Sequence, residues 1–247
     1  MELAADIAVR VQQLLQRQGN TPGQESNSLT ANCEHCGDVG YVVENGRAHE
    51  CQCVAEKRVA WSLPARYRKA SLLDFPQWMQ QAVLDWLARP GDGLLLTGGV
   101  GTGKTHLAAA ITRTLVMIRG QVMFRRCSEL YAAVRETYRL NLDERTVLEK
   151  YLKPRMLVLD DLGAGSLSDH ERRITLDVFD DRLNACLPTI TTTNWSLEEI
   201  GQKMDDRIAS RLSSFLAIEL TGTDRRLEQA GQPVWAASEQ NPVMEHA

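Results

Sequence analysis

One octapeptide constrains this chain more than any other feature. Residues 98–105 match the pattern G-x-x-x-x-G-K-[ST], whose glycines let the backbone wrap around phosphates with its N–H groups pointing inward. An apolar, strand-like run at 94–97 precedes the octapeptide, and a helix-like segment follows it. A bare match could be a plain turn, but these flanks favour a phosphate loop. The predicted nucleotide contacts are Gly98, Gly99, Val100, Gly101, Thr102, Gly103, Lys104, Thr105 and His106.

A second apolar run, 156–159, ends in two acids and predicts a metal-binding edge. Acids that follow a buried strand lie at the carboxyl end of a sheet, where α/β folds bind ligands. We expect Lys104 to reach the β- and γ-phosphates, and the Thr105 hydroxyl to bind Mg²⁺ together with Asp160. Asp161 would orient or deprotonate the attacking water. The alternative is an acidic strand end without a role.

Polar residues after the later strand signals extend the predicted site. Asn194 follows the run 190–193 and is placed to hydrogen-bond a γ-phosphate or a water, although an Asn there is often only a turn former. Arg207 and Arg211 are four residues apart and share one helix face. Either cation could stabilise a neighbouring subunit's nucleotide, or both could form ordinary pairs with the preceding acids. Spacing alone leaves both readings open.

The alternation of strand and helix signals predicts an α/β fold with a parallel sheet covered on both faces. The chain has 247 residues, of which 43% are hydrophobic and 24% charged, enough for one large domain and a small accessory module. We expect strands at 94–97, 121–126, 156–160, 188–193 and 216–220.

Composition excludes several other classes of protein. No apolar run approaches the roughly 18 residues that a membrane span requires. The first residues lack the basic start and apolar core of a signal peptide, so we expect a cytoplasmic protein with no membrane partner. The net charge of −4 means that any nucleic-acid binding must come from local basic patches.

The six cysteines are unevenly placed. In a reducing cytosol they are not expected to form disulfides. A C-x₂-C pair and a C-x-C pair offer four thiolates, the usual count for a tetrahedral structural Zn²⁺. A redox pair, unrelated thiols, an iron–sulfur cluster and a site that uses His49 remain alternatives. Cys127 and Cys186 stand apart and are expected to be small buried hydrophobes. The predicted zinc ligands are Cys33, Cys36, Cys51 and Cys53.

These signals divide the chain into four segments. Residues 1–60 are expected to form an N-terminal helix and a zinc-binding module, to which the family resemblance given below adds a role in docking a partner, and 61–90 a helical linker. Residues 91–227 would form the nucleotide-binding domain, which the same resemblance identifies as an AAA+ ATPase domain. The polar segment 228–247 is predicted to be a disordered tail.

Taken together, these residues resemble the AAA+ ATPases. Within that superfamily the chain is similar to the bacterial and phage helicase loaders of the DnaC/DnaI type, and the IstB transposition ATPases are close kin. The matching segments are GGVGTGKT (98–105), LVLDDLG (157–163), TTTN (191–194), DRIASRL (206–212) and DRR (224–226).

The resemblance implies roles that spacing alone does not. Asn194 would be the sensor-1 residue, Arg211 an arginine finger acting in trans, and Arg226 the sensor-2 residue, in an enzyme that hydrolyses ATP with Mg²⁺. Most AAA+ ATPases carry Asp-Glu where this chain has Asp160-Asp161. Because Asp is one methylene shorter than Glu, its reach to the water differs, and we expect slow, switch-like hydrolysis.

The resemblance also implies partners. Loaders of the DnaI kind carry a zinc-binding N-terminal module that docks on the helicase. We therefore expect a hexameric replicative helicase of the DnaB type, single-stranded DNA and further copies of this chain, in ATP-dependent loading of the helicase during replication. Interleaved acids make an ordinary charged helix face the alternative to DNA contact. The candidate DNA contacts are Arg135, Tyr138, Arg139, Arg145, Lys150, Lys153 and Arg155.

Rival functions remain. A transposition helper of the IstB kind would share the ATPase domain, but that family generally lacks a cysteine module. An adaptor gated by nucleotide with negligible hydrolysis is a second rival. A small-molecule kinase is the weakest, because nothing here resembles a lid or an acceptor site.

Overall fold

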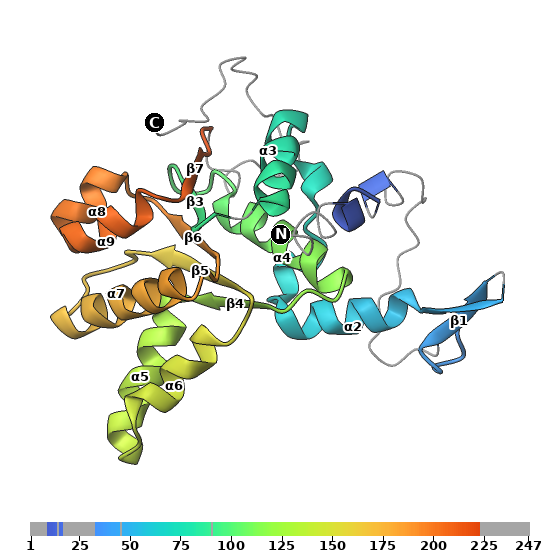
Figure 1. Ribbon diagram of the computed structural model, residues 1–247, viewed down its shortest axis with the longest axis horizontal. Helices are drawn as coiled ribbons and strands as arrows, with labels where there is room; N and C mark the ends of the chain where they lie inside the picture. The colour runs from blue at the N-terminus through green and yellow to red at the C-terminus, as the bar shows by residue number, and fades with distance from the viewer. Residues whose placement is uncertain (1–8, 14, 17–32, 45, 90, 223–247) are drawn as a thin grey trace.

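The computed structural model describes residues 9–13, 15–16, 33–44, 46–89 and 91–222. Within them, five parallel strands form one sheet in the order β4-β5-β6-β3-β7 (Figure 1). The strands are β3 (Gly93–Thr97), β4 (Val122–Arg126), β5 (Met156–Leu162), β6 (Thr189–Thr193) and β7 (Leu216–Glu219). The predicted α/β fold is confirmed, and each strand begins within a residue or so of its predicted start.

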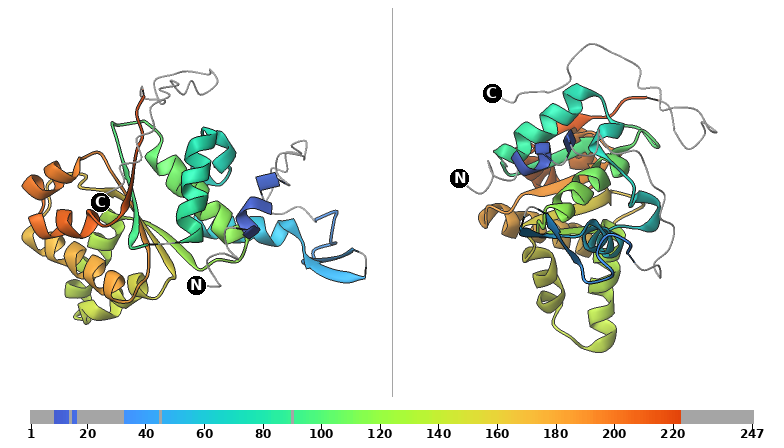
Figure 2. Two further views of the ribbon diagram at one scale, coloured as in Figure 1. Left: turned by 45° about the horizontal axis from the view of Figure 1, so that its top comes forward. Right: turned by 90° about the vertical axis from the view of Figure 1, so that its right-hand side faces the viewer.

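Helices cover both faces of the sheet (Figures 1 and 2). Side chains alternate across a strand, so Leu94 and Leu96 enter the core cluster beneath α4, while Leu95 enters the cluster on the opposite face. That opposite face carries the helices that follow β4. The helices are α4 (Lys104–Met117), α5 (Cys127–Leu140), α6 (Glu144–Leu152), α7 (Asp169–Asn184), α8 (Leu197–Lys203) and α9 (Asp206–Leu212).

The segment before the sheet packs on the α4 side. Here α2 (Gln52–Ser62) lies against α4 and is followed by two short 3₁₀ turns, η1 (Ala65–Tyr67) and η2 (Leu72–Asp74), and by α3 (Gln77–Ala88). Residues 61–90, which the sequence pattern suggests as a linker, bury Leu72, Met79 and Val83 in the same cluster as α4. The predicted boundary at residue 60 falls inside α2. The domain limits therefore stay predictions.

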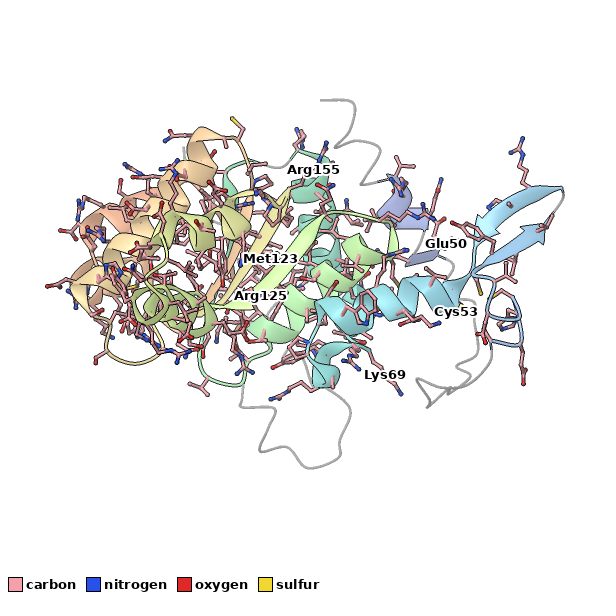
Figure 3. All side chains as sticks on the ribbon, turned by 90° about the horizontal axis from the view of Figure 1, so that it is seen from below. Glu50, Cys53, Lys69, Met123, Arg125 and Arg155 are labelled. Atoms are coloured by element: carbon pink, nitrogen blue, oxygen red, sulfur yellow. The ribbon has the colours of Figure 1, made fainter. Side chains whose placement is uncertain are left out.

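A small hairpin precedes α2. Strands β1 (Tyr41–Glu44) and β2 (Arg47–Glu50) pair antiparallel, with Tyr41 opposite Glu50. Helix α2 begins one residue after Cys51, so the second cysteine pair spans the junction between hairpin and helix. Figure 3 places Cys53 and Glu50 at one end of the molecule, away from Met123 and Arg125 in β4.

The two solitary cysteines differ. Cys127, the first residue of α5, is buried as predicted, and burial raises the pKa of its thiol. The prediction of a buried Cys186 was wrong, because this residue is exposed. It lies in the turn after α7 with φ 51°, where the Cys186 N–H bonds back to the Leu183 carbonyl at 3.0 Å and directs the chain toward β6.

The predicted tail 228–247 and Arg226 lie outside the described residues, and so do residues 1–8, 14 and 17–32 of the predicted N-terminal module. In the part of the chain that the structure describes, no helix is both long and apolar enough to cross a membrane.

Candidate functional site

The phosphate loop joins β3 to α4 through backbone conformations that favour glycine. Gly98, Gly101 and Gly103 have φ of 133°, 76° and 104°, in the region that L side chains rarely adopt. A Cβ on Gly98 would stand 2.1 Å from the Leu220 carbonyl oxygen, so this position also needs glycine for space. Helix α4 starts at the residue after Gly103, which directs its first N–H groups toward the loop.

Lys104 lies over the loop that precedes it. The residue is 7% exposed, and its Nζ donates to the carbonyl oxygens of Gly98 at 2.9 Å and Gly99 at 2.6 Å. The ammonium is thus held at the inner rim of the loop. A phosphate cradled there would find this charge beside the backbone N–H groups at the start of α4.

Asp160 and Thr105 meet at the carboxyl edge of the sheet. Asp160 is 3% exposed, and this burial raises the pKa of its carboxyl, while hydrogen bonds from the Thr192 and Thr105 hydroxyls oppose the rise. The Thr192 Oγ1 donates to Asp160 Oδ1 at 2.7 Å. A buried carboxylate beside a Thr hydroxyl is the donor set that holds Mg²⁺ in phosphate-loop nucleoside triphosphatases, so these residues fit the metal.

Asp161 occupies a bulge that turns it away from its neighbour. The ladder between β5 and β6 shifts between Leu159 and Leu162, and Asp161 adopts φ 64° and is exposed. Its N–H donates to Thr192 Oγ1 at 2.8 Å. One threonine therefore fixes both acids, and Asp161 is left with an exposed side chain beside a buried Asp160.

Thr192 is a site residue that the sequence interpretation missed, because its role depends on the pairing of β5 with β6. Arg126 is another: it is exposed, it stands opposite Asp160 in the β4–β5 ladder, and its charge opposes the rise in the pKa of that buried carboxyl. The Arg125-Arg126 pair at the end of a strand was the available signal.

Asn194 follows β6 directly, at the same edge as Asp160, and is exposed. The adjacent Thr193 fixes the strand end, since its hydroxyl donates to the Leu162 carbonyl at 2.9 Å and accepts from the Trp195 N–H at 3.2 Å. The structure thus brings Asn194 and the acids of β5 to one edge of the sheet.

His106 faces the segment before the sheet. Its Nε2 lies 2.8 Å from Asp74 Oδ2, and its ring packs against Phe75 and Tyr67 with centroids 5.6 and 6.4 Å apart. These contacts tie the first turn of α4 to η1 and η2, next to the predicted phosphate site. A nucleotide contact by His106 stays a prediction.

The two arginines of α9 are paired within the chain. Arg211 bonds to Asp180 of α7 through its Nε, and Arg207 bonds to Asp205 at 2.8 and 3.0 Å. Arg207 holds the pKa of Asp205 at about 2. Both side chains remain partly exposed, so each lies on the surface.

Four thiols gather at the far end of the molecule. The ligand atoms of Cys33, Cys36, Cys51 and Cys53 lie within 4.8 Å of one another, with two Sγ–Sγ distances of 3.6 Å. A tetrahedral zinc places its sulfurs about 3.8 Å apart when each lies about 2.3 Å from the metal. Backbone N–H groups of Cys36 and His35 lower the pKa of Cys33 to about 7, whereas burial and the neighbouring thiols raise the pKa values of Cys51 and Cys53, so a bound cation would be needed to hold all of them as thiolates.

The geometry of this cluster fits an all-cysteine zinc module. Among the described residues, the cluster holds these cysteines and neither His35 nor His49, although His49 lies in β2 close by. The Gly40 N–H donates to Cys36 Sγ at 3.4 Å and its carbonyl accepts from the Cys51 N–H at 2.9 Å, as expected for a turn folded around a metal.

The candidate DNA-contact region is the α5–α6 hairpin. Half of the six candidate cations have acidic partners: Arg135 pairs with Glu171, Arg139 with Glu136, and Lys153 with Glu149. Tyr138 donates to Glu144 at 2.9 Å and is 63% exposed. These pairs match the charged-face alternative for individual residues, and contact with DNA stays a prediction.

The model of the family described as IstB-like ATP binding protein matches residues 60–216. The chain belongs to this family. The match begins within α2 and covers the sheet as far as the start of β7, so it includes the phosphate loop and both acids of β5. The resemblance to the IstB and DnaC/DnaI branch of the AAA+ ATPases is confirmed.

Relatives of this IstB-like chain include a helicase loader and an ATP-binding protein of an insertion sequence. The replicative helicase loader DnaC of Escherichia coli K12 is 29% identical over 119 residues, covering 48% of this chain and 49% of DnaC. The putative ATP-binding protein of insertion sequence IS1162 from Pseudomonas fluorescens is 33% identical over 116 residues, covering 44% of this chain and 49% of that protein. The chain thus spans about half the length of the curated relatives it matches.

The crystal structure of DnaI supports the same fold. It superposes with a TM-score of 0.55 at 25% identity, covering 66% of this IstB-like chain and 94% of that one. Family membership therefore establishes an ATP-binding AAA+ fold, and the finer activity rests on proposals.

Proposed function

We propose that this chain is an ATP-dependent loader of a hexameric replicative helicase onto single-stranded DNA. The observation that carries the proposal is a four-thiol module joined by one continuous helix to an IstB-like ATPase fold. The similarity to a protein named helicase loader supports it. In this reading the module and its surroundings hold the helicase, and the ATPase fold responds to nucleotide.

The nucleotide site is built from the residues at the carboxyl edge of the sheet. The phosphate loop and Lys104 bind the phosphates, and Thr105 and Asp160 hold Mg²⁺. When bound, the metal neutralises charge that develops on the β- and γ-phosphates. Asp161 orients the attacking water, and Asn194 acts as the sensor. Arg226, which lies outside the described residues, stays a proposed sensor-2 residue.

Arg211 would complete the site of a neighbouring copy. Its bond to Asp180 holds the guanidinium on the surface of α9, and exchanging that carboxylate for a neighbour's γ-phosphate would stabilise the transition state in trans. Hydrolysis then requires assembly, which matches the expected slow turnover of the isolated chain. Rapid ATP turnover by the purified chain alone would contradict this part of the proposal.

A mixing experiment tests the arrangement in trans. Lys104→Ala chains keep Arg211 but bind ATP poorly, and Arg211→Ala chains bind ATP but offer no finger. In the presence of single-stranded DNA and helicase, each variant alone should release no phosphate from ATP. An equimolar mixture of the two variants should regain phosphate release. Arg207→Ala, one turn away and paired with Asp205, is the matched control and should stay active. A mixture as inactive as its components would contradict a finger in trans.

Loading itself is tested by transfer of the cognate hexameric helicase to a single-stranded DNA circle. We expect transfer to require the chain and ATP, and to fail with Lys104→Ala. Absence of any helicase binding would contradict the proposal.

The IS1162 relative favours one alternative, a transposition helper that partners a transposase on duplex DNA. Binding of a transposase instead of the helicase would promote it. An adaptor without useful hydrolysis predicts transfer by the chain with no phosphate release above background, and no effect of Arg211→Ala on either readout.

A further inference from the structure

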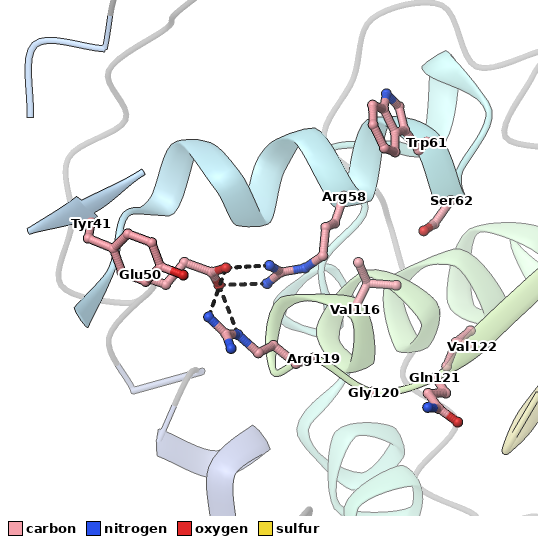
Figure 4. A pocket seen from close by; sticks show the side chains of 10 residues that line it. All are labelled: Tyr41, Glu50, Arg58, Trp61, Ser62, Val116, Arg119, Gly120, Gln121 and Val122. Carbon is pink, nitrogen blue, oxygen red and sulfur yellow. Dashed lines mark hydrogen bonds and ion pairs between the residues drawn. The ribbon is translucent and has the colours of Figure 1, made fainter. Parts of the chain in front are cut away.

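A cavity of about 490 Å³ lies where the cysteine module meets the ATPase fold (Figure 4). Its walls come from the β1–β2 hairpin, the second half of α2, the end of α4 with the turn after it, and the start of β4. The cavity is thus at the amino edge of the sheet, whereas the phosphate loop lies at the carboxyl edge. Its size is within the range of ligand pockets, but it is shallow and largely open to solvent, as a docking surface for a partner is.

One carboxylate in this cavity is shared by two arginines. Glu50 of β2 accepts from both terminal nitrogens of Arg58 at 2.6 and 2.8 Å, and Arg119, in the turn after α4, lies 3.0 Å away (Figure 4). Two guanidinium groups and one carboxylate leave one net positive charge. Arg119 is 57% exposed, so part of its guanidinium still faces solvent at the mouth of the cavity.

The same region exposes large apolar side chains. Trp61, near the end of α2, is 89% exposed and lines the cavity together with Tyr41, which is 56% exposed. Val43 is 73% exposed and shares the face of β1 with Tyr41, because the strand alternates its side chains. Figure 4 shows Tyr41 at the hairpin end of this surface and Trp61 at its other end, so a partner that lies along the surface can contact both aromatic side chains.

We propose that this composite pocket docks a segment of the replicative helicase that presents an aliphatic side chain and a carboxylate. The aliphatic group packs on the exposed face of Trp61, and the carboxylate pairs with Arg119. The inference rests on the proposed function and extends it. It assigns docking to a surface built jointly by the cysteine module and the ATPase fold, with Trp61 and Arg119 contributed by α2 and by the turn after α4.

Charge favours a protein over a nucleic acid as the occupant. A phosphate backbone needs several unpaired cations, and it would here meet Glu50, whose carboxylate stands between both arginines. A single partner carboxylate instead matches the one net positive charge, and the exposed indole supplies the kind of anchor that dominates protein interfaces.

The test measures affinity of the full-length chain for its cognate hexameric helicase by biolayer interferometry. Trp61→Ala should weaken binding at least tenfold. Arg119→Gln should weaken it several-fold and flatten its dependence on salt, because a charge pair is lost. Trp78→Ala removes another exposed tryptophan, on α3, and should change affinity less than twofold. Unchanged zinc content and ATP affinity show that each variant is folded.

The outcomes separate the two proposals. If the wild-type chain does not bind the helicase, the proposed function fails and this inference fails with it. If the wild-type chain binds and neither Trp61→Ala nor Arg119→Gln weakens binding, only this inference is overturned. It is also overturned if Trp61→Ala leaves helicase binding intact but weakens binding of a fluorescent single-stranded oligonucleotide, or if it acts only on self-association in analytical ultracentrifugation.

Discussion

The carboxyl edge of the sheet and the cysteine module are both built from short, recognisable spacings, but different forces hold them. The phosphate loop is set between β3 and α4, whose apolar residues are buried from Leu94 to Val116. The module has a two-stranded hairpin with Val39, Tyr41 and Val43 exposed, and its four thiols lie together. The first site should keep its shape without a ligand, whereas the second should depend on its metal.

Removing zinc should produce the largest difference in stability between the two regions. Structural zinc sites contribute on the order of 10 kcal/mol to folding, so chelation or Cys51→Ser should unfold the hairpin and the start of α2. Hydrogen exchange should then show lost protection at residues 41–50 and retained protection in β3 and β6. Cys186→Ser, at an exposed cysteine outside the cluster, is the control. Full protection of the hairpin in the presence of chelator would show that the module does not depend on its metal.

Lys104→Ala should act on the other region alone. Loss of the ammonium beside the phosphates should lower ATP affinity on the order of 100-fold, or about 2.7 kcal/mol, measured by calorimetry. Zinc content should not change. Lys150→Ala, an exposed lysine on α6, should leave the affinity within twofold. Comparable ATP affinity in Lys104→Ala and wild type would mean that the loop does not bind phosphate.

Arg182→Met should weaken the sheet without touching either site. Arg182 is 1% exposed, and its guanidinium donates to Thr189 Oγ1 and to the carbonyls of Tyr151, Pro154 and Pro188. Because several acceptors lose their donor, urea unfolding should show a loss of about 2 kcal/mol. Zinc content should be retained.

The matched control for this substitution is Arg139→Met. Its side chain is 73% exposed, and its change should stay within about 0.5 kcal/mol. Equal stability of the two variants would mean that the buried guanidinium of Arg182 does not stabilise the loops before β5 and β6.

Glu50→Gln should have the smallest effect on stability. Glu50 lies where the cysteine module contacts the ATPase fold. Hydrogen bonds from Arg58 lower the pKa of Glu50, so its stabilisation is complete above the unfolded value of about 4.3 and is lost as pH falls through the lower folded pKa. The variant should lose about 1 kcal/mol of local stability at neutral pH. Hydrogen exchange of β2 and of the turn at Arg119 should approach wild-type rates as pH falls below about 4. A difference independent of pH would contradict this charge pairing.

Local spacing was sufficient to predict what depends on neighbours in sequence. The phosphate loop, the strand limits and the four-thiol cluster all follow from short patterns. The role of Thr192 did not, because it arises only when β6 pairs with β5 and aligns its hydroxyl with Asp160. The pairing of Arg211 with Asp180 depends in the same way on how α9 packs against α7, and the packing of 61–90 depends on a partner helix far along the chain.

Helix α4 runs for 14 residues, about 21 Å, from Lys104 to Met117. Its first turn holds the groups proposed for phosphate and Mg²⁺, and Val116 near its last turn lines the cavity against the cysteine module. This one continuous helix therefore has one end at the phosphate site and the other against the cysteine module. If nucleotide and helicase bind as proposed, each becomes an effector of the other, and linkage requires that any change ATP makes in helicase affinity be matched by an equal change that the helicase makes in ATP affinity.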